Sequence, residues 1–213
     1  MTWSLGEIEG LARKAARGAG FDWGMAEEAG KAVRWLAGLG LPGPEVLDAF
    51  LAAYDRTPHA QMRPMDVTAP TWTAAGGPLC PISAGAALCD IAQDAGLPGD
   101  IAIPECACPL LLIPFVAAAS EDGGHALHVV WEGGEFAFAS DIRGHATVPM
   151  ALMGRAVIRR GTAPDLPLPR CQLRYDLDSA PAARLTDLAR RTYAPDTEAS
   201  RTSGAGSGLS DND

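Results

Sequence analysis

Apolar and polar residues alternate at helical spacing through the first quarter of the chain. Residues 4–7 (SLGE) have the form of a capping box, and apolar positions follow with helical periodicity over 8–18. The same pattern predicts helices over 23–37 and 44–54, with glycines and a proline between them. Residues 1–56 are therefore predicted to form a three-helix layer.

The next stretch, residues 57–81, has no periodicity and contains five prolines. Loops longer than about 12–15 residues are uncommon in compact domains, so this one is expected to wrap the surface or to act as a lid. A helix is predicted over 83–95, because apolar residues return there at helical spacing.

The clearest local signal is a β-hairpin formed by residues 125–131 and 136–141. Gly133-Gly134 supplies the positive φ angles of a two-residue turn, which sets the register and places Trp131 opposite Phe136. One face of the hairpin then carries four large apolar side chains: Val129, Trp131, Phe136 and Phe138.

The apolar run 110–119 is expected to join this hairpin as a further strand, giving an antiparallel meander over 110–141. Both faces of that sheet would be apolar, so we expect both sides to be covered, at least partly by helices. A helix over 149–160, an alternating strand over 171–177 and a last helix capped by Ser179 follow. The predicted class is α+β: a three-helix layer, then a mainly antiparallel sheet with packed helices.

The length of 213 residues and the apolar content of 47% predict an ordered protein with one integrated domain. Its parts are the helical layer 1–56, the Pro-rich loop 57–81, an α+β body 82–193 and a Gly-rich acidic tail 194–213. That tail is flexible by composition, because little in it can offset the entropy of ordering.

Charge and apolar runs exclude two classes of partner. Lys plus Arg number 17 and Asp plus Glu 26, giving a net charge of −9 that repels nucleic acid. The longest apolar run, 109–119, contains two prolines and is shorter than the roughly 20 residues of a membrane helix, so no membrane association is expected. The first residues lack the pattern of a secretory signal, and five cysteines, an odd number, suggest reduced thiols. A cytoplasmic protein is expected.

Cys106 and Cys108 are weak candidates for a metal site. In an extended segment, residues two apart point the same way, and Cys80 and Cys89 precede them. Thiolates suit zinc, but the spacing matches no familiar zinc pattern, and free cysteines are commonly buried as small hydrophobic residues. Buried structural thiols are therefore the favoured interpretation, and the sequence names no cofactor.

His125, His128 and Asp141 are the candidate catalytic residues. His125 is expected at the open end of the hairpin near Asp141, where such a pair could transfer protons. His128 is expected on the alanine-rich second face, where small neighbours leave room for a ligand. The competing interpretations are a polar loop and a buried neutral histidine with one hydrogen bond.

Arg13, Lys14 and Arg17 form a basic stripe near the end of the first helix, where the helix dipole favours cations. The functional alternative is an anion receptor, and the acidic end of the chain is one candidate anion. The residues of this hypothetical ligand site are Arg17, Trp23, Glu27, Arg201, Asp211 and Asp213. No motif of a major enzyme class is present.

Two segments resemble an uncharacterised bacterial domain-of-unknown-function family. The N-terminal segment comprises residues 14–20 (KAARGAG), 23–24 (WG), 26–30 (AEEAG) and 34–36 (RWL). The C-terminal segment comprises 193–201 (YAPDTEASR) and 204–213 (GAGSGLSDND). The resemblance implies a stand-alone bacterial cytosolic protein and supplies no activity or catalytic residue. It leaves an ordered tail and a flexible tail as equal alternatives, and for the ordered tail our hypothesis is that its acidic end docks on Arg17 or a neighbouring arginine.

Three functional hypotheses follow. The first is a small-molecule-binding or accessory protein of bacterial metabolism, with a pocket between the helical layer and the sheet. The second is an enzyme of uncharacterised type that uses a His/Asp or Cys/His site. The third is a subunit that needs a protein partner, or a second copy of itself, to cover apolar surface.

Overall fold

The computed structural model describes residues 1–94, 97, 99–163 and 165–193. The α-helices of this part of the chain are α1 (Leu5–Gly18), α2 (Trp23–Gly38), α3 (Gly43–Tyr54), α4 (Pro81–Asp94), α5 (Ile113–Gly123) and α6 (Ser179–Arg190). The strands are β1 (Thr2–Ser4), β2 (Ile101–Ala107), β3 (Leu127–Trp131), β4 (Gly134–Phe138), β5 (Ile142–Ala146), β6 (Met153–Arg160) and β7 (Arg174–Asp176). Two short 3₁₀ helices are η1 (His59–Met62) and η2 (Pro109–Leu112).

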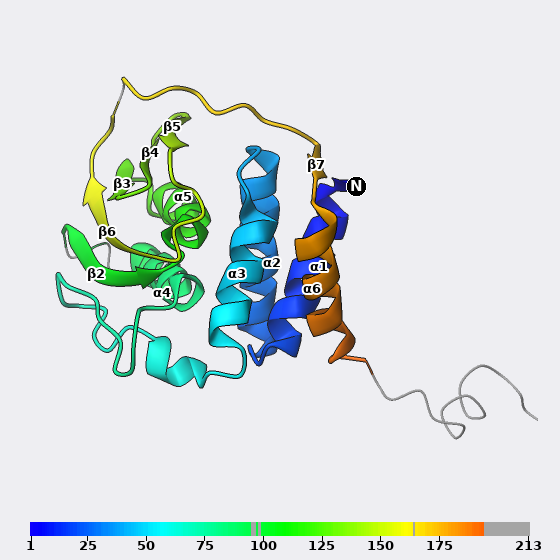
Figure 1. Cartoon of the computed structure of the whole chain (residues 1–213). Coiled ribbons are helices and arrows are strands. Elements are labelled where there is room, and N and C mark those ends of the chain that lie inside the picture. The colour runs from blue at the N-terminus through cyan, green and yellow to red at the C-terminus, as the bar shows by residue number, and fades with distance from the viewer. Residues whose placement is uncertain (95–96, 98, 164, 194–213) are drawn as a thin grey trace, which may run out of the picture.

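The main sheet has five antiparallel strands in the order β2-β6-β3-β4-β5, and β1 pairs with β7 in a separate two-stranded ribbon. Helices precede and cover this antiparallel sheet, so the α+β class is confirmed. Figure 1 shows the sheet on the left, then α4 and α5, then α2 and α3, and finally α1 and α6. Buried side chains from all these layers form one hydrophobic cluster.

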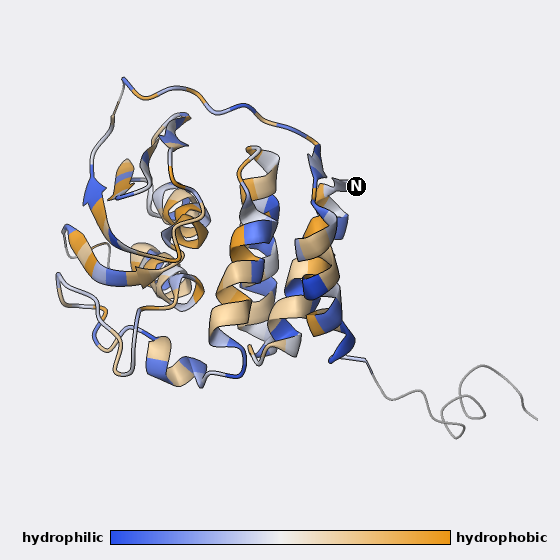
Figure 2. Cartoon of the chain, in the orientation of Figure 1, coloured by the Kyte–Doolittle hydropathy of each residue, from blue (hydrophilic) through white to orange (hydrophobic). Residues whose placement is uncertain are grey.

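The N-terminal helices begin where the sequence predicts. The Glu7 amide donates to the Ser4 hydroxyl (3.3 Å), and the Ser4 amide donates to the Glu7 carboxylate (2.8 Å), which completes the capping box of α1. Asp22 caps α2 by accepting from the Met25 amide at 2.8 Å. Figure 2 shows hydrophobic residues concentrated on α3, α4 and α5, which lie between the sheet and the outer helices.

The hairpin exists, but its turn lies one residue earlier than predicted. Trp131 pairs with Gly134, so the turn is Glu132-Gly133, and Val129 rather than Trp131 faces Phe136. Gly134 adopts a φ of 152°, in the region that favours glycine, as the first residue of β4. The register shift amounts to two residues, and the predicted aromatic face is therefore kept: Phe136 stacks with Trp131 and with Phe138 at 6.2 and 6.3 Å.

The predicted strand over 110–119 is wrong, because this segment forms η2 and α5. Pro114 lies in the first turn of α5, where its missing N–H is not needed, and three alanines at 117–119 continue the helix. The helix packs on the inner face of β3 and β4. The outer face carries half-buried residues such as Val130 and Val157, so the cover expected on that side is incomplete.

The predicted helix over 149–160 is also wrong, because Met153–Arg160 is the second strand of the sheet order, β6. Its small or apolar residues Gly154, Ala156 and Ile158 are buried and alternate with exposed arginines. The strand predicted over 171–177 is present as the shorter β7, which pairs with β1 and not with the main sheet. Period-two alternation thus outweighs the helical propensity of individual residues.

The Pro-rich loop wraps the surface and extends the sheet at its β2 edge. The Trp72 amide donates to the Ala102 carbonyl (2.8 Å) and the Leu79 amide to the Glu105 carbonyl (2.8 Å). The side chains of Met62, Trp72 and Leu79 are fully buried beneath it. Because β2 and β5 are opposite edges of the sheet, the loop is not a lid over a cavity at β5.

The last helix, α6, completes the helical layer by packing on α1. Its N-cap is Asp178, which makes no side-chain capping bond, so the predicted cap at Ser179 is wrong. Gly18 permits the close approach, since a Cβ there would lie 1.9 Å from the Leu188 carbonyl oxygen. Arg184 also donates to the buried Asp48 carboxylate of α3, with Nε 2.9 Å from Oδ2.

Candidate functional site

Trp35 lies where the helical layer meets the sheet. The stacked rings of Trp131, Phe136 and Phe138 run along the inner face of the hairpin, and Trp35 of α2 packs edge-on against Phe138 at 6.2 Å. Trp35 is only half-buried, so one part of its indole completes the aromatic row and the rest lines open space. An exposed aromatic surface beside a cavity is a common feature of ligand sites.

The larger of two cavities at this position, named the α2 cavity, has a volume of about 460 Å³. Its walls come from α1, from one stripe of α2, from β5 and from the segment before β7. The lining residues are Leu5, Glu9, Lys31, Arg34, Trp35, Gly38, Leu39, Ile142 and Cys171. Most of this surface is apolar, and charged groups are confined to Glu9, Lys31 and Arg34.

The second cavity, named the α5 cavity, has a volume of about 390 Å³. It extends from α5 to the bend between β4 and β5. Its lining residues are Trp35, Pro114, Ala117, Ala118, Ser120, Glu121, Phe138, Ala139, Ser140, Asp141 and Ile142. Trp35 and Ile142 belong to both linings, so the two cavities adjoin, and we name them together the Trp35 groove.

The wall that carries Cys171 is fixed to the end of α2 by Gln172. The Gln172 amide donates to the Gly38 carbonyl (2.7 Å), and its side-chain Nε2 donates to the Ala37 carbonyl (3.0 Å). The first of these bonds satisfies the last carbonyl of α2, and the second adds to the bond that the Ala37 carbonyl already accepts from the Gly40 amide (3.0 Å). In Figure 1 the connection from β6 runs along the top of the molecule to β7, which brings this segment over from the sheet.

Charges differ between the two cavities. In the α2 cavity Arg34 pairs with Glu9 (2.8 Å), and Lys31, on the same helix, pairs with Glu28 (2.7 Å). The hydrogen bond to Glu28 raises the pKa of Lys31, which therefore stays charged. The lining of the α5 cavity has two carboxylates, Glu121 and Asp141, and no cationic side chain.

The three candidate catalytic residues have different surroundings. The His128 ring nitrogen lies 3.0 Å from the Glu135 carboxylate on the outer face of the sheet, while Asp141 is paired with Arg143 (2.8 Å) at the end of β4. His125 is exposed and follows α5. His128–Glu135 is thus a diagonal pair on neighbouring strands, which stabilises a sheet and can also exchange a proton. Of the three, Asp141 lines the Trp35 groove.

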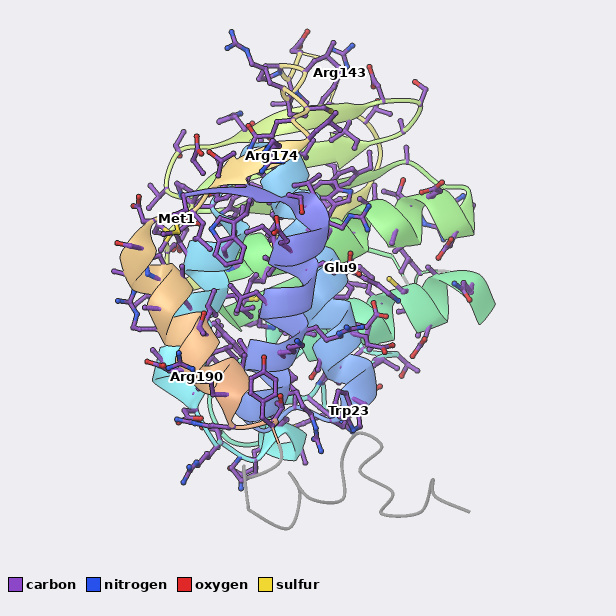
Figure 3. All side chains as sticks on the ribbon, turned by 90° about the vertical axis from the view of Figure 1, so that its right-hand side faces the viewer. Met1, Glu9, Trp23, Arg143, Arg174 and Arg190 are labelled. Carbon is purple, nitrogen blue, oxygen red and sulfur yellow. The ribbon has the colours of Figure 1, made fainter. Side chains whose placement is uncertain are left out.

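Arg17 and Trp23 are brought together at the other end of the molecule. The Arg17 guanidinium lies over the Trp23 ring at 5.0 Å and donates to the Phe21 carbonyl (2.7 Å), which ties down the turn after α1. Figure 3 shows Trp23 at the bottom and Arg143 at the top, so these residues are remote from Asp141. Glu27 is exposed on α2. Arg201, Asp211 and Asp213 lie outside the described residues.

Three of the five cysteines are buried, namely Cys80, Cys106 and Cys108, while Cys89 is half-buried. Cys108 adopts a left-handed conformation (φ 43°) that ends β2, so it does not continue the extended geometry assumed for the Cys106–Cys108 pair. Burial raises the pKa of Cys108 to about 12, and burial likewise raises the pKa values of Cys80 and Cys106. No group of three or more metal-binding side chains was found among the described residues. Cys171 is exposed.

Sequence reasoning missed the residues on which the groove depends. Trp35, Ile142 and Cys171 come from three separate segments, and only the tertiary structure brings them together. One signal was available for Trp35, because a tryptophan two positions from the buried Val33 and next to Leu36 lies at the border of the apolar stripe. Large aromatic residues at such borders often face another element or a ligand.

Comparison with known proteins adds one finding. Residues 3–80 match the model of a family described as "Protein of unknown function (DUF3726)". The resemblance to an uncharacterised domain family is thereby confirmed for the N-terminal part of the chain, whereas the C-terminal stretch lies beyond the match. The matched residues supply the α1 and α2 walls of the Trp35 groove. No curated protein and no solved structure matches the chain.

A search of the described residues for membrane-spanning segments gave none: no helix there is both long and apolar enough to cross a bilayer.

Proposed function

We propose that the protein binds a small organic molecule in the Trp35 groove, as an accessory protein of bacterial metabolism. The observation that carries this proposal is the pair of adjoining cavities, of about 390 and 460 Å³, that share Trp35 and Ile142. Ligand pockets commonly have volumes of about 300–1,000 Å³, with mostly apolar walls and few polar groups.

The proposed site lies between the helical layer and the sheet, where two layers built by different parts of the chain meet. Its walls are held by the aromatic row and by the Gln172 bonds, which supports a largely preformed site. We place the protein in the bacterial cytoplasm, a proposal supported by five cysteines that are all free thiols.

Cys171 offers a direct test, because it is an exposed thiol on the wall of the groove. The purified chain is incubated with a set of small disulfide-bearing fragments under partly reducing conditions, and the mixed disulfides are identified by intact mass. Fragments with apolar rings should accumulate on Cys171 well above the level set by simple exchange. Trp35→Ala should abolish this selection, whereas Trp23→Ala, which changes an exposed tryptophan outside the groove, should not. Equal capture of all fragments by the unaltered chain would contradict the proposal.

A further inference from the structure

We infer that the ligand is an organic amine, with its ammonium group in the α5 cavity and its apolar body across Trp35 into the α2 cavity. The inference rests on the proposed function, since it names the class of molecule that the same groove takes. The ligand is identified by its chemistry alone: one cationic nitrogen joined to an aromatic ring or a short apolar chain.

The charged residues of the α5 cavity are the first reason to expect an amine. Glu121 and Asp141 are the charged residues of its lining, and both are carboxylates. Glu121 makes no side-chain hydrogen bond or ion pair with any described residue, so its charge is available to a ligand, whereas Asp141 also holds Arg143. Glu121 therefore attracts a cation that enters this cavity and repels an anion, whereas the charge of Asp141 is largely balanced by Arg143.

The aromatic side chains of the α5 cavity are the second reason to expect an amine. Trp35 and Phe138 line the cavity beside the two carboxylates, and their rings cross at 61°. The face of an indole attracts cations within about 6 Å of its centre. Phe138 is only 3% exposed, so Trp35 is the aromatic side chain of this lining that offers open surface. The Ser120 hydroxyl is occupied, because it donates to the His125 carbonyl (2.7 Å).

The lining of the α2 cavity indicates the chemistry of the rest of the ligand. Its apolar lining residues include Leu5, Trp35, Leu39 and Ile142, which suit an apolar body. The basic groups there, Lys31 and Arg34, are already neutralised by Glu28 and Glu9. An anionic head group would have to break these pairs, whereas an ammonium group at the other end of the groove displaces no ion pair with Glu121. Charge complementarity therefore favours a cation over an anion.

Three probes of similar shape and different charge test the inference: tryptamine, tryptophol and indoleacetate. Their affinities for the full chain are measured by titration calorimetry. The amine should bind about three- to thirtyfold more tightly than the neutral alcohol, as one partly exposed charge contact with Glu121 and a cation–π contact predict. The carboxylate should bind more weakly than the alcohol. Added salt should weaken the amine selectively.

Substitutions of groove residues test where the ammonium group of the ligand binds. Glu121→Gln should lower the affinity for tryptamine about three- to fivefold and leave that for tryptophol unchanged. Glu132→Gln, a matched change of an exposed carboxylate on the β3–β4 turn, should leave both affinities unchanged. Trp35→Leu should weaken all probes that bind.

The outcomes separate the two proposals. Equal affinity for amine and alcohol, or tightest binding of indoleacetate, would overturn the amine inference and leave groove binding intact. No binding of any probe, together with loss of fragment selection at Cys171, would overturn both. A stable dimer in which Cys171 is protected without ligand would show that a second copy fills the groove, and would also overturn both.

Discussion

Tyr175→Phe tests how the segment that carries Cys171 is anchored to the helical layer. The Tyr175 hydroxyl donates to the Glu45 carboxylate at 2.9 Å, and Tyr175 is 9% exposed, so the substitution removes one hydrogen bond and keeps the packed ring. Hydrogen bonds to charged groups contribute about 1.5–3 kcal/mol, and the partial exposure of Glu45 reduces this to about 1–2 kcal/mol. The free energy of unfolding should fall by that amount, which lowers the melting temperature by about 2–8 °C.

The raised pKa of Glu45 determines how the stability of the protein changes with pH. Burial raises the pKa of Glu45 above its ordinary value of 4.5, while the Tyr175 hydrogen bond opposes the rise. A carboxyl group whose folded pKa is raised destabilises the folded state once it is ionised, so stability is lost as the pH rises through that pKa. Glu45→Gln keeps an acceptor for Tyr175 without the charge. It should therefore stabilise the protein at neutral pH, and this gain should vanish below about pH 4, where Glu45 is protonated.

The assay is urea unfolding at neutral and acidic pH, with Tyr54→Phe as the matched control, because no hydrogen bond was found for the Tyr54 hydroxyl among the described residues. The control should leave the free energy of unfolding within about 0.5 kcal/mol of the parent value. An equal stability of Tyr175→Phe and the parent chain at neutral pH would refute the reasoning. So would a Glu45→Gln variant that is destabilised at neutral pH.

Three further predictions concern packing and thiol reactivity. Gly18→Ala should destabilise the protein by about 1–3 kcal/mol in thermal unfolding, because its Cβ would meet Leu188. Gly10→Ala on the same helix meets nothing within 4 Å and should instead stabilise by about 0.5–1 kcal/mol; the same sign for both would contradict the α1–α6 contact. A thiol reagent near pH 8 should modify Cys171 rapidly in the native chain and the buried Cys80, Cys106 and Cys108 only after unfolding, so rapid native labelling of these three would argue against their burial. Gln172→Ala should speed the labelling of Cys171 and weaken ligand binding, and an unchanged rate would show that the wall does not depend on Gln172.

The sequence predicted those elements that local signals determine. The capping box at Ser4 and the apolar stripe of the first helix required no tertiary information, and both are present. The hairpin kept its aromatic face in spite of the wrong turn, because a shift of two residues preserves the side that each residue occupies. The α+β class followed from these elements.

The errors arose where an apolar run had no period of its own. Residues 110–119 are apolar at nearly every position, and such a run fits a buried helix as well as a buried strand. Assigning it to the sheet left no place for β6, whose alternation of buried residues with arginines was misread as helical. The outer face of the sheet was then assigned apolar side chains that belong to α5.

The candidate site was the least predictable part. A pocket between the helical layer and the sheet was expected, but its residues come from α1, α2, α5, the bend after β4 and the segment before β7. No local pattern links Trp35 to Ile142 or to Cys171, because their proximity depends on the strand order and on the path from β6 to β7. Among the predicted site residues that the structure describes, Asp141 is the one that lines the groove, and its predicted partner was a histidine rather than Arg143.

The central claim is that the Trp35 groove binds a small organic molecule, and an amide NMR titration of the isotope-labelled chain tests it most directly. A mixture of indole-sized fragments is added, and the shifted signals are assigned. The account predicts the largest shifts at the amides of Trp35, Leu39 and Ile142, saturating with concentration and absent in Trp35→Ala. Shifts confined to the Pro-rich loop or to the outer face of the sheet, or no shifts at all, would contradict it.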